Sequence, residues 1–406
     1  MDIRKMLQEQ DQLQVLRFES ELTPEEKQNL YSQLENVDFR MIRDAMQSAD
    51  KKMADEIGPA DTLTIAMQEA DKETYLQAGN EALKQGKMAA VILAGGQGSR
   101  LGHDGPKGTV NVGITRDKYL FEILLENVRR NTDPLHTVMH VYIMTSDINH
   151  ESTVSFFEEH DYFGYPKDHL HFFRQDMAPA LDLQGKLLLE TKSGVSLAPN
   201  GNGGWFRSLQ RQGLVDQMKS FGVEWLDVVS VDSVLQNIGD PLYLGAALVK
   251  GMYCGAKVVS KVTPEEKVGA SCIRNGHPSI VEYSELSDEM RYAKNPDGTY
   301  QYQYGAIVNY LFNIRETEKR AGESMPVHKA IKKISCLDES GAPVVPAEPN
   351  AIKMEYFIFD ILEFFDSCLF MECIREDEFA PIKNASGVDS LESARKLYTA
   401  RFGDIL

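Results

Sequence analysis

The sequence predicts an α/β protein with a doubly wound, mostly parallel sheet, and two observations lead to this fold class. An unbroken apolar run, Met88 to Leu93, runs directly into a glycine-rich loop, which is typical of a strand buried on both faces. Beyond it, strand-like and helix-like stretches alternate up to about residue 315, which indicates successive βα units. Ligands of such sheets bind at the carboxyl ends of the strands, so we expect the site there.

Individual stretches support this alternation. Apolar and aromatic runs predict strands, and the amphipathic stretches between them predict helices. Strands are expected at 88–93, 141–144, 170–173, 225–229 and 257–259, and helices near 117–130, 148–160, 204–220 and 241–252. Asn275-Gly276 predicts a hairpin within 268–286, and 300–312 is predicted as a further strand.

The chain is expected to fall into three consecutive parts. Residues 1–87 have helical apolar spacing and lack strand-like runs, and Thr23 followed by a proline predicts a helix start. We expect this helical extension to pack on a central α/β domain, residues 88–335. The C-terminal segment, 336–406, is expected to complete the site and to end in an amphipathic helix from about Ser390.

Composition limits the classes of partner. The net charge of −18 argues against nucleic acid and anionic membranes as partners, and no apolar run of 18 residues or secretory leader is recognisable. The five cysteines have no C-x-x-C spacing, so they predict neither a disulfide framework nor a zinc site. A reducing, cytoplasmic location is therefore expected. The sequence carries no signal of oligomeric state.

The loop after the first strand has the composition of a phosphate site. Gly95, Gly96 and Gly98 allow the backbone to approach an anion closely and to point amides at it. Arg100 and Lys107 add positive charge to the same loop. A plain strand-to-helix turn is the alternative, but it has no use for these two cations.

Two nucleotide-binding motifs are not matched. A dinucleotide fingerprint would need a third glycine where Leu101 stands, and an acid ending a second strand about 20 residues on. A P-loop would need Ser or Thr after Lys107, where the chain has Gly108. What remains is a mononucleotide site that holds phosphates with backbone amides, one arginine and one lysine.

Other segment ends carry polar groups. The amide of Gln175 can complement one edge of a uracil-like base, and glycines around Asn202 allow close approach to a base or sugar. Asp232 ends a strand opposite the phosphate loop, where a Mg²⁺ ligand is expected, although a helix cap or turn is the alternative. Glu282 could bind sugar hydroxyls or be an ordinary strand-edge charge.

Two lysines near the C-terminus are candidate phosphate ligands. Lys353 and Lys383 lie in runs dense in aromatic and acidic residues, which are hard to explain as core alone. An isolated lysine is more often solvated, so this alternative stays open.

Six blocks in order resemble the eukaryotic-type UDP-sugar pyrophosphorylases, and among these the UDP-N-acetylhexosamine pyrophosphorylases. The blocks are LAGGQGSRLG with PKG at 106–108, PNGNGG at 199–204, VD at 231–232, VEYSE at 281–285, KMEYFIFD at 353–360 and REDEFAPIKN at 375–384. The resemblance implies a glycosyltransferase-A-like nucleotide domain with a helical N-terminal extension and a small C-terminal domain. It implies that UTP and a sugar 1-phosphate give a UDP-sugar and pyrophosphate, with Mg²⁺, or Mn²⁺ as the alternative metal.

The resemblance also implies a role for each residue that matches a block. Arg100, Lys107 and Lys383 would be catalytic, Lys353 and Lys383 would contact phosphates, and Asp232 would take the metal. The nucleotide would be held by Ala94, Gly95, Gly96, Gln175 and Gly201, and the sugar by Asn202, Gly269, Glu282, Tyr283, Phe357 and Phe359.

Three positions depart from the family pattern and leave the sugar open. Ala306 stands where the acetylhexosamine enzymes usually carry Asn, Asp176 where they carry Gly, and Ser233 where they carry Asn. N-acetylglucosamine 1-phosphate is the expected substrate, with N-acetylgalactosamine, glucose or galactose 1-phosphate as alternatives. A nicotinamide oxidoreductase would need the dinucleotide fingerprint that this sequence lacks. A non-catalytic sugar-nucleotide-binding protein is the other alternative, but it would not need the charged groups of Arg100, Lys107, Asp232 and Lys383.

Overall fold

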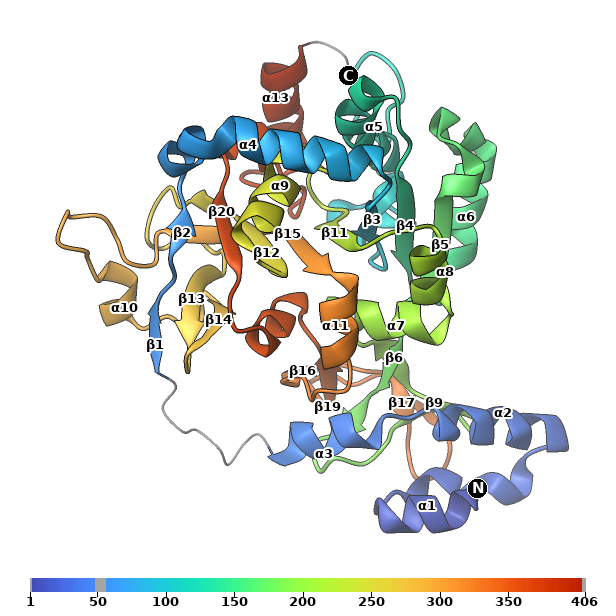
Figure 1. Cartoon of the computed structure of the whole chain (residues 1–406). Coiled ribbons are helices and arrows are strands. Elements are labelled where there is room, and N and C mark those ends of the chain that lie inside the picture. Colours follow the sequence, from blue (N-terminus) through green and yellow to red (C-terminus); the bar gives the residue numbers. More distant parts are fainter. Residues whose placement is uncertain (1, 48–55, 404–406) are drawn as a thin grey trace. The chain divides into compact units, whose positions relative to one another are not determined.

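The computed structural model describes residues 2–47 and 56–403, which form two compact units (Figure 1). The units interleave along the chain, so they differ from the consecutive parts 1–87, 88–335 and 336–406 expected from the sequence. The smaller unit comprises Met1–Ala54, Asp176–Gly204 and Ser324–Ile358, and the larger unit comprises Asp55–Gln175, Trp205–Glu323 and Phe359–Leu406.

The larger unit is built on one sheet that has 11 strands within the described residues. Its main path runs β2-β20-β12-β15-β11-β3-β4-β5, and β13 pairs with β1, β14 and β15 beside that path. The strands are β1 (Ile57–Pro59), β2 (Thr62–Leu63), β3 (Met88–Leu93), β4 (His140–Thr145), β5 (Leu170–Arg174), β11 (Trp225–Ser230), β12 (Cys254–Ser260), β13 (Ala270–Arg274), β14 (His277–Val281), β15 (Tyr304–Asn313) and β20 (Leu369–Glu372).

Most pairings on the main path are parallel, which confirms the predicted fold class. β11, β3, β4 and β5 run parallel, as do β12 with β20 and β20 with β2. β15 lies antiparallel between β11 and β12. All six residues of β3 are apolar and buried, as predicted for a strand covered on both faces.

Helices pack around this sheet (Figure 1). They are α4 (Ile65–Lys84), α5 (Leu120–Thr132), α6 (His150–Glu159), α7 (Trp205–Arg211), α8 (Leu214–Ser220), α9 (Pro241–Lys250), α10 (Asp288–Tyr292), α11 (Ile314–Arg320), α12 (Arg375–Glu378) and α13 (Leu391–Phe402). α4 and α9 touch backbone to backbone: a Cβ on Gly79 would lie 1.8 Å from the Pro241 carbonyl oxygen, and one on Gly245 would lie 1.7 Å from that of Tyr75. Glycine at both crossings lets the two helices pack this closely.

Two short strands lie where the sequence predicted helix only. β1 pairs antiparallel with β13, and β2 pairs parallel with β20. Strands of three and two residues are too short to show an alternating pattern, and their partners lie more than 200 residues away along the chain. Only the tertiary fold could reveal them.

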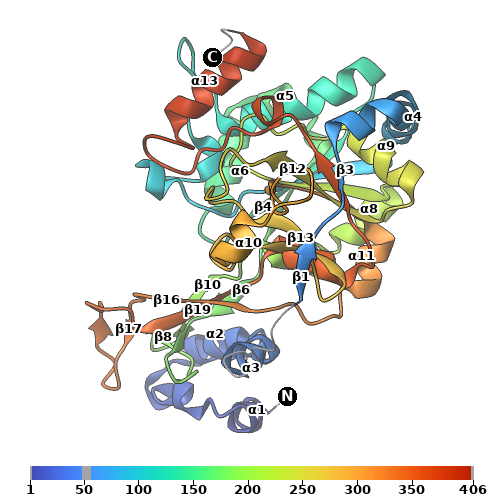
Figure 2. The same ribbon diagram turned by 90° about the vertical axis from the view of Figure 1, so that its left-hand side faces the viewer.

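The smaller unit combines helices with short antiparallel strands. Figure 2 shows α1, α2 and α3 on one side of the strands. Thr23 begins α2 with a capping box and a proline in the first turn, as predicted. The elements are α1 (Ile3–Glu9), α2 (Pro24–Glu35), α3 (Phe39–Gln47), β6 (Met177–Pro179), β7 (Leu181–Asp182), β8 (Leu189–Thr191), β9 (Gly194–Val195), β10 (Leu197–Pro199), β16 (His328–Lys332), β17 (Cys336–Leu337), β18 (Pro343–Val344) and β19 (Ala351–Glu355).

A buried glutamine joins the N-terminal helices to the strands of the smaller unit. The side chain of Gln12 donates to the Gly185 carbonyl at 2.9 Å and accepts from the Leu187 amide at 2.9 Å. Both contacts satisfy backbone groups that would otherwise be buried without partners. Among the described residues, no helix of either unit is long and apolar enough to span a bilayer.

Asp227, in the middle of β11, is a buried acid whose ionisation should make stability depend on pH. Burial raises its pKa to about 7, although the Gly239 amide donates to its Oδ2 at 2.6 Å and Lys257 lies near. Between pH 4 and pH 7 the folded state therefore holds a proton on Asp227 that the unfolded state releases. The free energy of unfolding falls as pH rises through this range.

We therefore expect Asp227→Asn to become more stable relative to wild type as pH rises. The difference in unfolding free energy should grow by about 2–3 kcal/mol between pH 5 and pH 8 and then level off. Urea unfolding of both proteins at pH 5, 6, 7, 8 and 9 measures it. A difference that stays constant over this range would contradict the assignment.

Candidate active site

The glycine-rich loop after β3 is closed by its own backbone. The Lys107 amide donates to the Gly96 carbonyl at 3.1 Å, and the Gly98 amide donates to the Gly105 carbonyl at 2.9 Å. These bonds return the chain to the end of β3, so Lys107 lies beside the first glycines of the loop. The loop is therefore a defined structure, as a site that binds phosphate through backbone amides requires.

The side chain of Asn149, just before α6, fixes the start of this loop by hydrogen bonds. Its side-chain amide donates to the Ala94 carbonyl at 3.0 Å and to the Gly96 carbonyl at 3.2 Å, and its own oxygen accepts from the Ser146 amide at 2.7 Å. The side chain is fully buried. Sequence reasoning missed this residue, and its position shortly after a strand end was the one signal available.

Gln175, at the end of β5, lies directly against Gly95. A Cβ placed on Gly95 would lie 2.2 Å from the Gln175 amide nitrogen, so the glycine makes room for this side chain. The Gln175 backbone amide donates to the Thr145 carbonyl at 2.8 Å, and the residue is 6% exposed. Two residues predicted to bind the nucleotide, 80 positions apart in sequence, are thus neighbours. Gly96 has open space around it.

Lys107 and Asp232 form an ion pair at the carboxyl ends of β3 and β11. Lys107 Nζ lies 2.5 Å from Asp232 Oδ1, and their side chains are 15% and 28% exposed. Arg100, in the same loop as Lys107, is exposed and contacts no carboxylate among the residues that the structure describes. The larger unit therefore presents Arg100, Lys107 and Asp232 around the glycine-rich loop.

A C-terminal stretch, residues 380–383, lies beside Asp232 and is joined to it by hydrogen bonds. The Ile382 amide donates to the Asp232 carbonyl at 2.8 Å, and the Ala380 amide donates to the Ser233 hydroxyl at 2.9 Å. Lys383 follows with an exposed side chain, and its amide donates to the Asp389 carbonyl at 2.6 Å. Asp232 and Lys383, 151 positions apart, are therefore brought together.

Three residues predicted to line the sugar pocket lie near one another in the larger unit. A Cβ on Gly269 would lie 2.6 Å from Ile280 and 3.6 Å from the Glu282 carboxylate. Tyr283 follows with 40% of its surface exposed. The Gly269 carbonyl accepts from the Ala306 amide at 2.8 Å, which places the Ala306 position beside this group. Phe359 belongs to the same unit and is half-buried.

The smaller unit brings its own predicted site residues together. Gly201 has φ +84°, and a Cβ there would lie 2.4 Å from the Tyr356 carbonyl oxygen, so both conformation and space require glycine. Asn202 Oδ1 accepts from the Ile358 amide at 3.0 Å, next to Phe357. On β19, Lys353 Nζ lies 2.7 Å from Glu355 Oε1.

Asp232 is suited to share a metal ion with a substrate. Within the described residues, no three His, Cys, Asp or Glu side chains gather to form a metal site by themselves. Mg²⁺ commonly takes one or two carboxylates and completes its coordination with substrate phosphates and water. A single, partly exposed carboxylate beside a phosphate-type loop fits that pattern.

Comparison with known proteins decides the family. The family model described as UTP–glucose-1-phosphate uridylyltransferase matches residues 34–405. The chain belongs to this family. The family assignment identifies the chain as a nucleotidyltransferase.

Individual relatives agree with the family assignment. The chain is 37% identical to the UDP-N-acetylhexosamine pyrophosphorylase-like protein 1 of Mus musculus, over 96% of this chain and 81% of the relative. It is 35% identical to the UDP-N-acetylglucosamine diphosphorylase 2 of Arabidopsis thaliana, over 96% and 82%. The crystal structure of the UDP-N-acetylglucosamine pyrophosphorylase of Trypanosoma brucei is similar with a TM-score of 0.84 and 26% identity, over 98% and 85%.

Proposed function

We propose that this uridylyltransferase transfers the uridylyl group of UTP to N-acetylglucosamine 1-phosphate and releases pyrophosphate. The observation that carries the proposal is the pairing of Lys107 with Asp232 beside the closed glycine-rich loop. This arrangement supplies a cation and a carboxylate where a nucleoside triphosphate would place its phosphates. The names of the relatives support the choice of sugar.

The reaction needs charge neutralisation and positioning. A phosphate oxygen of the sugar 1-phosphate attacks the α-phosphorus of UTP, and the bond from that phosphorus to the pyrophosphate oxygen breaks in line with it. The leaving pyrophosphate carries away the electron pair, so no protein nucleophile is required. Cations near the leaving and attacking oxygens then supply most of the rate enhancement.

Each predicted site residue has a role in this proposal. Arg100 and Lys107 stabilise the leaving pyrophosphate, and Lys353 and Lys383 contact phosphates. The nucleotide is bound by Ala94, Gly95, Gly96, Gln175 and Gly201, and the sugar by Asn202, Gly269, Glu282, Tyr283, Phe357 and Phe359.

Asp232 would hold Mg²⁺, or Mn²⁺ as the alternative. When bound, the ion would neutralise phosphate charge. Lys107 Nζ is paired with Asp232 Oδ1. Binding of the triphosphate would draw the lysine toward the phosphates and leave the Asp232 carboxylate available to the metal ion. A cytoplasmic location is proposed from the five free cysteines, and the net charge of −18 argues against nucleic acid or an anionic membrane as a partner.

Glucose or galactose 1-phosphate is the second candidate acceptor. Ala306 offers only a methyl group beside Gly269 and Glu282, where a polar side chain would add a hydrogen bond to the sugar. A site without such a group discriminates less sharply between a sugar and its acetamido derivative.

The expected result is release of pyrophosphate from UTP with N-acetylglucosamine 1-phosphate. The assay compares this acceptor with N-acetylgalactosamine, glucose and galactose 1-phosphates, with ATP, CTP and dTTP as nucleotide controls, and with EDTA to remove the metal. We expect kcat/KM to be highest with UTP and N-acetylglucosamine 1-phosphate, by about 10-fold over glucose 1-phosphate, and EDTA to abolish release. Preference for an unmodified hexose would favour the second candidate, whereas binding of UTP without release would indicate a non-catalytic protein.

A further inference from the structure

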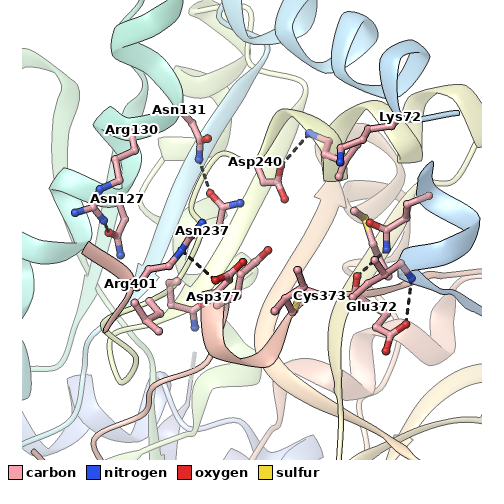
Figure 3. Close-up of a pocket in the computed structure, with 18 of the residues that line it drawn as sticks. Lys72, Asn127, Arg130, Asn131, Asn237, Asp240, Glu372, Cys373, Asp377 and Arg401 are labelled. Carbon is pink, nitrogen blue, oxygen red and sulfur yellow. Dashed lines mark hydrogen bonds and ion pairs between the residues drawn. The ribbon is translucent and has the colours of Figure 1, made fainter. Parts of the chain in front are cut away.

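Lys257, in the middle of β12, is a buried charged side chain that the proposed reaction does not use. The residue has no exposed surface, and its Nζ lies 2.7 Å from Asp240 Oδ2 and 2.5 Å from Glu378 Oε2. Asp240 and Glu378 also line a cavity of about 360 Å³, in which Figure 3 labels Asp240. We call Lys257, Asp240 and Glu378 the buried ion triad.

The triad is costly to bury and is therefore a weak means of stabilising the fold. Burial acts to lower the pKa of Lys257, but Asp240 and Glu378 raise it, so the lysine stays charged. Burial raises the pKa of Glu378 against the opposing effect of Lys257. Removing such ions from water offsets much of their attraction, and fixing one specific geometry is a recognised use of a buried ionic network.

The two carboxylates belong to the two segments that carry proposed phosphate-site residues. Asp240 caps α9 eight positions after Asp232, within what we call the Asp232 segment (residues 231–240). Glu378 ends α12 five positions before Lys383, within the Lys383 segment (residues 375–384). Lys257 therefore contacts both segments at once, from a strand in the centre of the sheet.

Three hydrogen bonds join the same segments near Asp232: the two described above, which the Ala380 and Ile382 amides donate, and one that the Val234 amide donates to the Ala380 carbonyl at 3.2 Å. Other contacts at the cavity are more exposed than the triad, and one of them involves Asn237 of the Asp232 segment, whose side chain also bonds to Glu378. Figure 3 shows Arg401 paired with Asp377 at 3.2 Å and Asn131 bonded to Asn237 at 2.7 Å.

We propose that Lys257 is a positioning residue that holds the Lys383 segment in register with the Asp232 segment through the buried ion triad. In this arrangement the Lys383 ammonium and the Asp232 carboxylate act on the same phosphates. The inference rests on the proposed function of Asp232 and Lys383. Lys257 itself touches no substrate.

Lys257→Met tests the proposal, because it keeps an unbranched side chain only one atom shorter and removes its charge. We expect kcat to fall by about 10- to 100-fold, because Lys383 loses its alignment, while the Kd of UTP changes by less than about threefold. Kinetics of pyrophosphate release and calorimetric titration with UTP measure the two quantities. A fall in UTP affinity that accounts for the whole loss would overturn the proposal.

A double-mutant cycle with Lys383→Ala separates positioning from general damage. If Lys257 acts through Lys383, Lys257→Met should lower kcat by less than about threefold in the Lys383→Ala background. A purely structural defect would lower kcat by the same factor in both backgrounds. Equal factors would therefore overturn the proposal.

Lys118→Met is the matched control. Lys118 is also buried, with 3% of its side chain exposed, and pairs with Glu126 at 2.8 Å. That pair touches neither segment, so this variant should lose stability comparably while kcat stays within about twofold of wild type. A loss of kcat as large as that of Lys257→Met would mean that any buried ion pair has this effect.

Hydrogen exchange measures the positioning without relying on catalysis. The amides of Ala380 and Ile382 should exchange at least about 10-fold faster in Lys257→Met than in wild type, with the amides of β3 and β4 unchanged. If Lys257→Met does not fold, Glu378→Gln removes one charge of the triad with less disturbance and should give the same changes to a smaller degree. Wild-type protein that releases no pyrophosphate would defeat the proposed function alone, whereas unchanged exchange at residues 380–382 would defeat this inference.

Discussion

Lys107→Ala should lower kcat for pyrophosphate release by about 10²- to 10³-fold. Lys107 is the cation that the closed glycine-rich loop returns to the end of β3, where its Nζ lies 2.5 Å from Asp232 Oδ1. In the proposed reaction it neutralises negative charge that builds up on the leaving pyrophosphate. Charge that develops in the transition state is what a fixed cation stabilises most, so kcat should fall more than UTP affinity.

The measurement is steady-state kinetics with UTP and the preferred sugar 1-phosphate, together with a thermal unfolding curve. Lys72→Ala is the matched control, because Lys72 is a half-exposed lysine of the same unit that pairs with its helical neighbour Glu69, at 2.6 Å. It should change kcat by less than about twofold. If Lys107→Ala kept more than a third of wild-type turnover, Lys107 would have no place in the mechanism.

Gly95→Ala should raise the Kd of UTP by about 10- to 100-fold, which corresponds to the loss of one to two hydrogen bonds to the base. The added Cβ would lie 2.2 Å from the Gln175 amide nitrogen and 2.8 Å from its Cδ. Because these atoms end a flexible side chain, the glutamine can swing away at small cost to stability. The proposed base contact is then lost, and discrimination between UTP and CTP should weaken as well.

Calorimetric titration with UTP and CTP, with the melting temperature as a second readout, measures this effect. Gly322→Ala is the matched control, since a Cβ there meets nothing within 4 Å and the residue lies on an exposed turn. It should leave the affinity for both nucleotides unchanged. Wild-type affinity and selectivity in Gly95→Ala would show that Gln175 does not read the base.

Much of the larger unit could be predicted because its signals are local. The apolar run of β3, the Asn275-Gly276 turn between β13 and β14, and the helix start at Thr23 each depend on neighbours a few residues away. The candidate site residues could be named for the same reason, because glycines and cations cluster within short motifs. Their roles remain predictions until they are tested by substitution.

The supporting residues could not be predicted in this way. Asn149 is one buried amide without a motif, and Lys257 is one lysine within an apolar strand. What each does is defined by partners between 17 and 121 positions away in the chain. No periodicity or spacing records such a pairing.

The sequence by itself determined the fold class, the glycine-rich loop and the types of charged group in the site. Local stiffness, side-chain size and apolar periodicity act over a few residues, so they can be read in order along the chain. Only the tertiary structure decided that Gly95 makes room for Gln175, that Lys107 pairs with Asp232, and that Lys257 joins the Asp232 and Lys383 segments. These contacts exist because packing of the sheet brings distant strand ends together, and buried charges and amides must then find partners among whatever lies beside them.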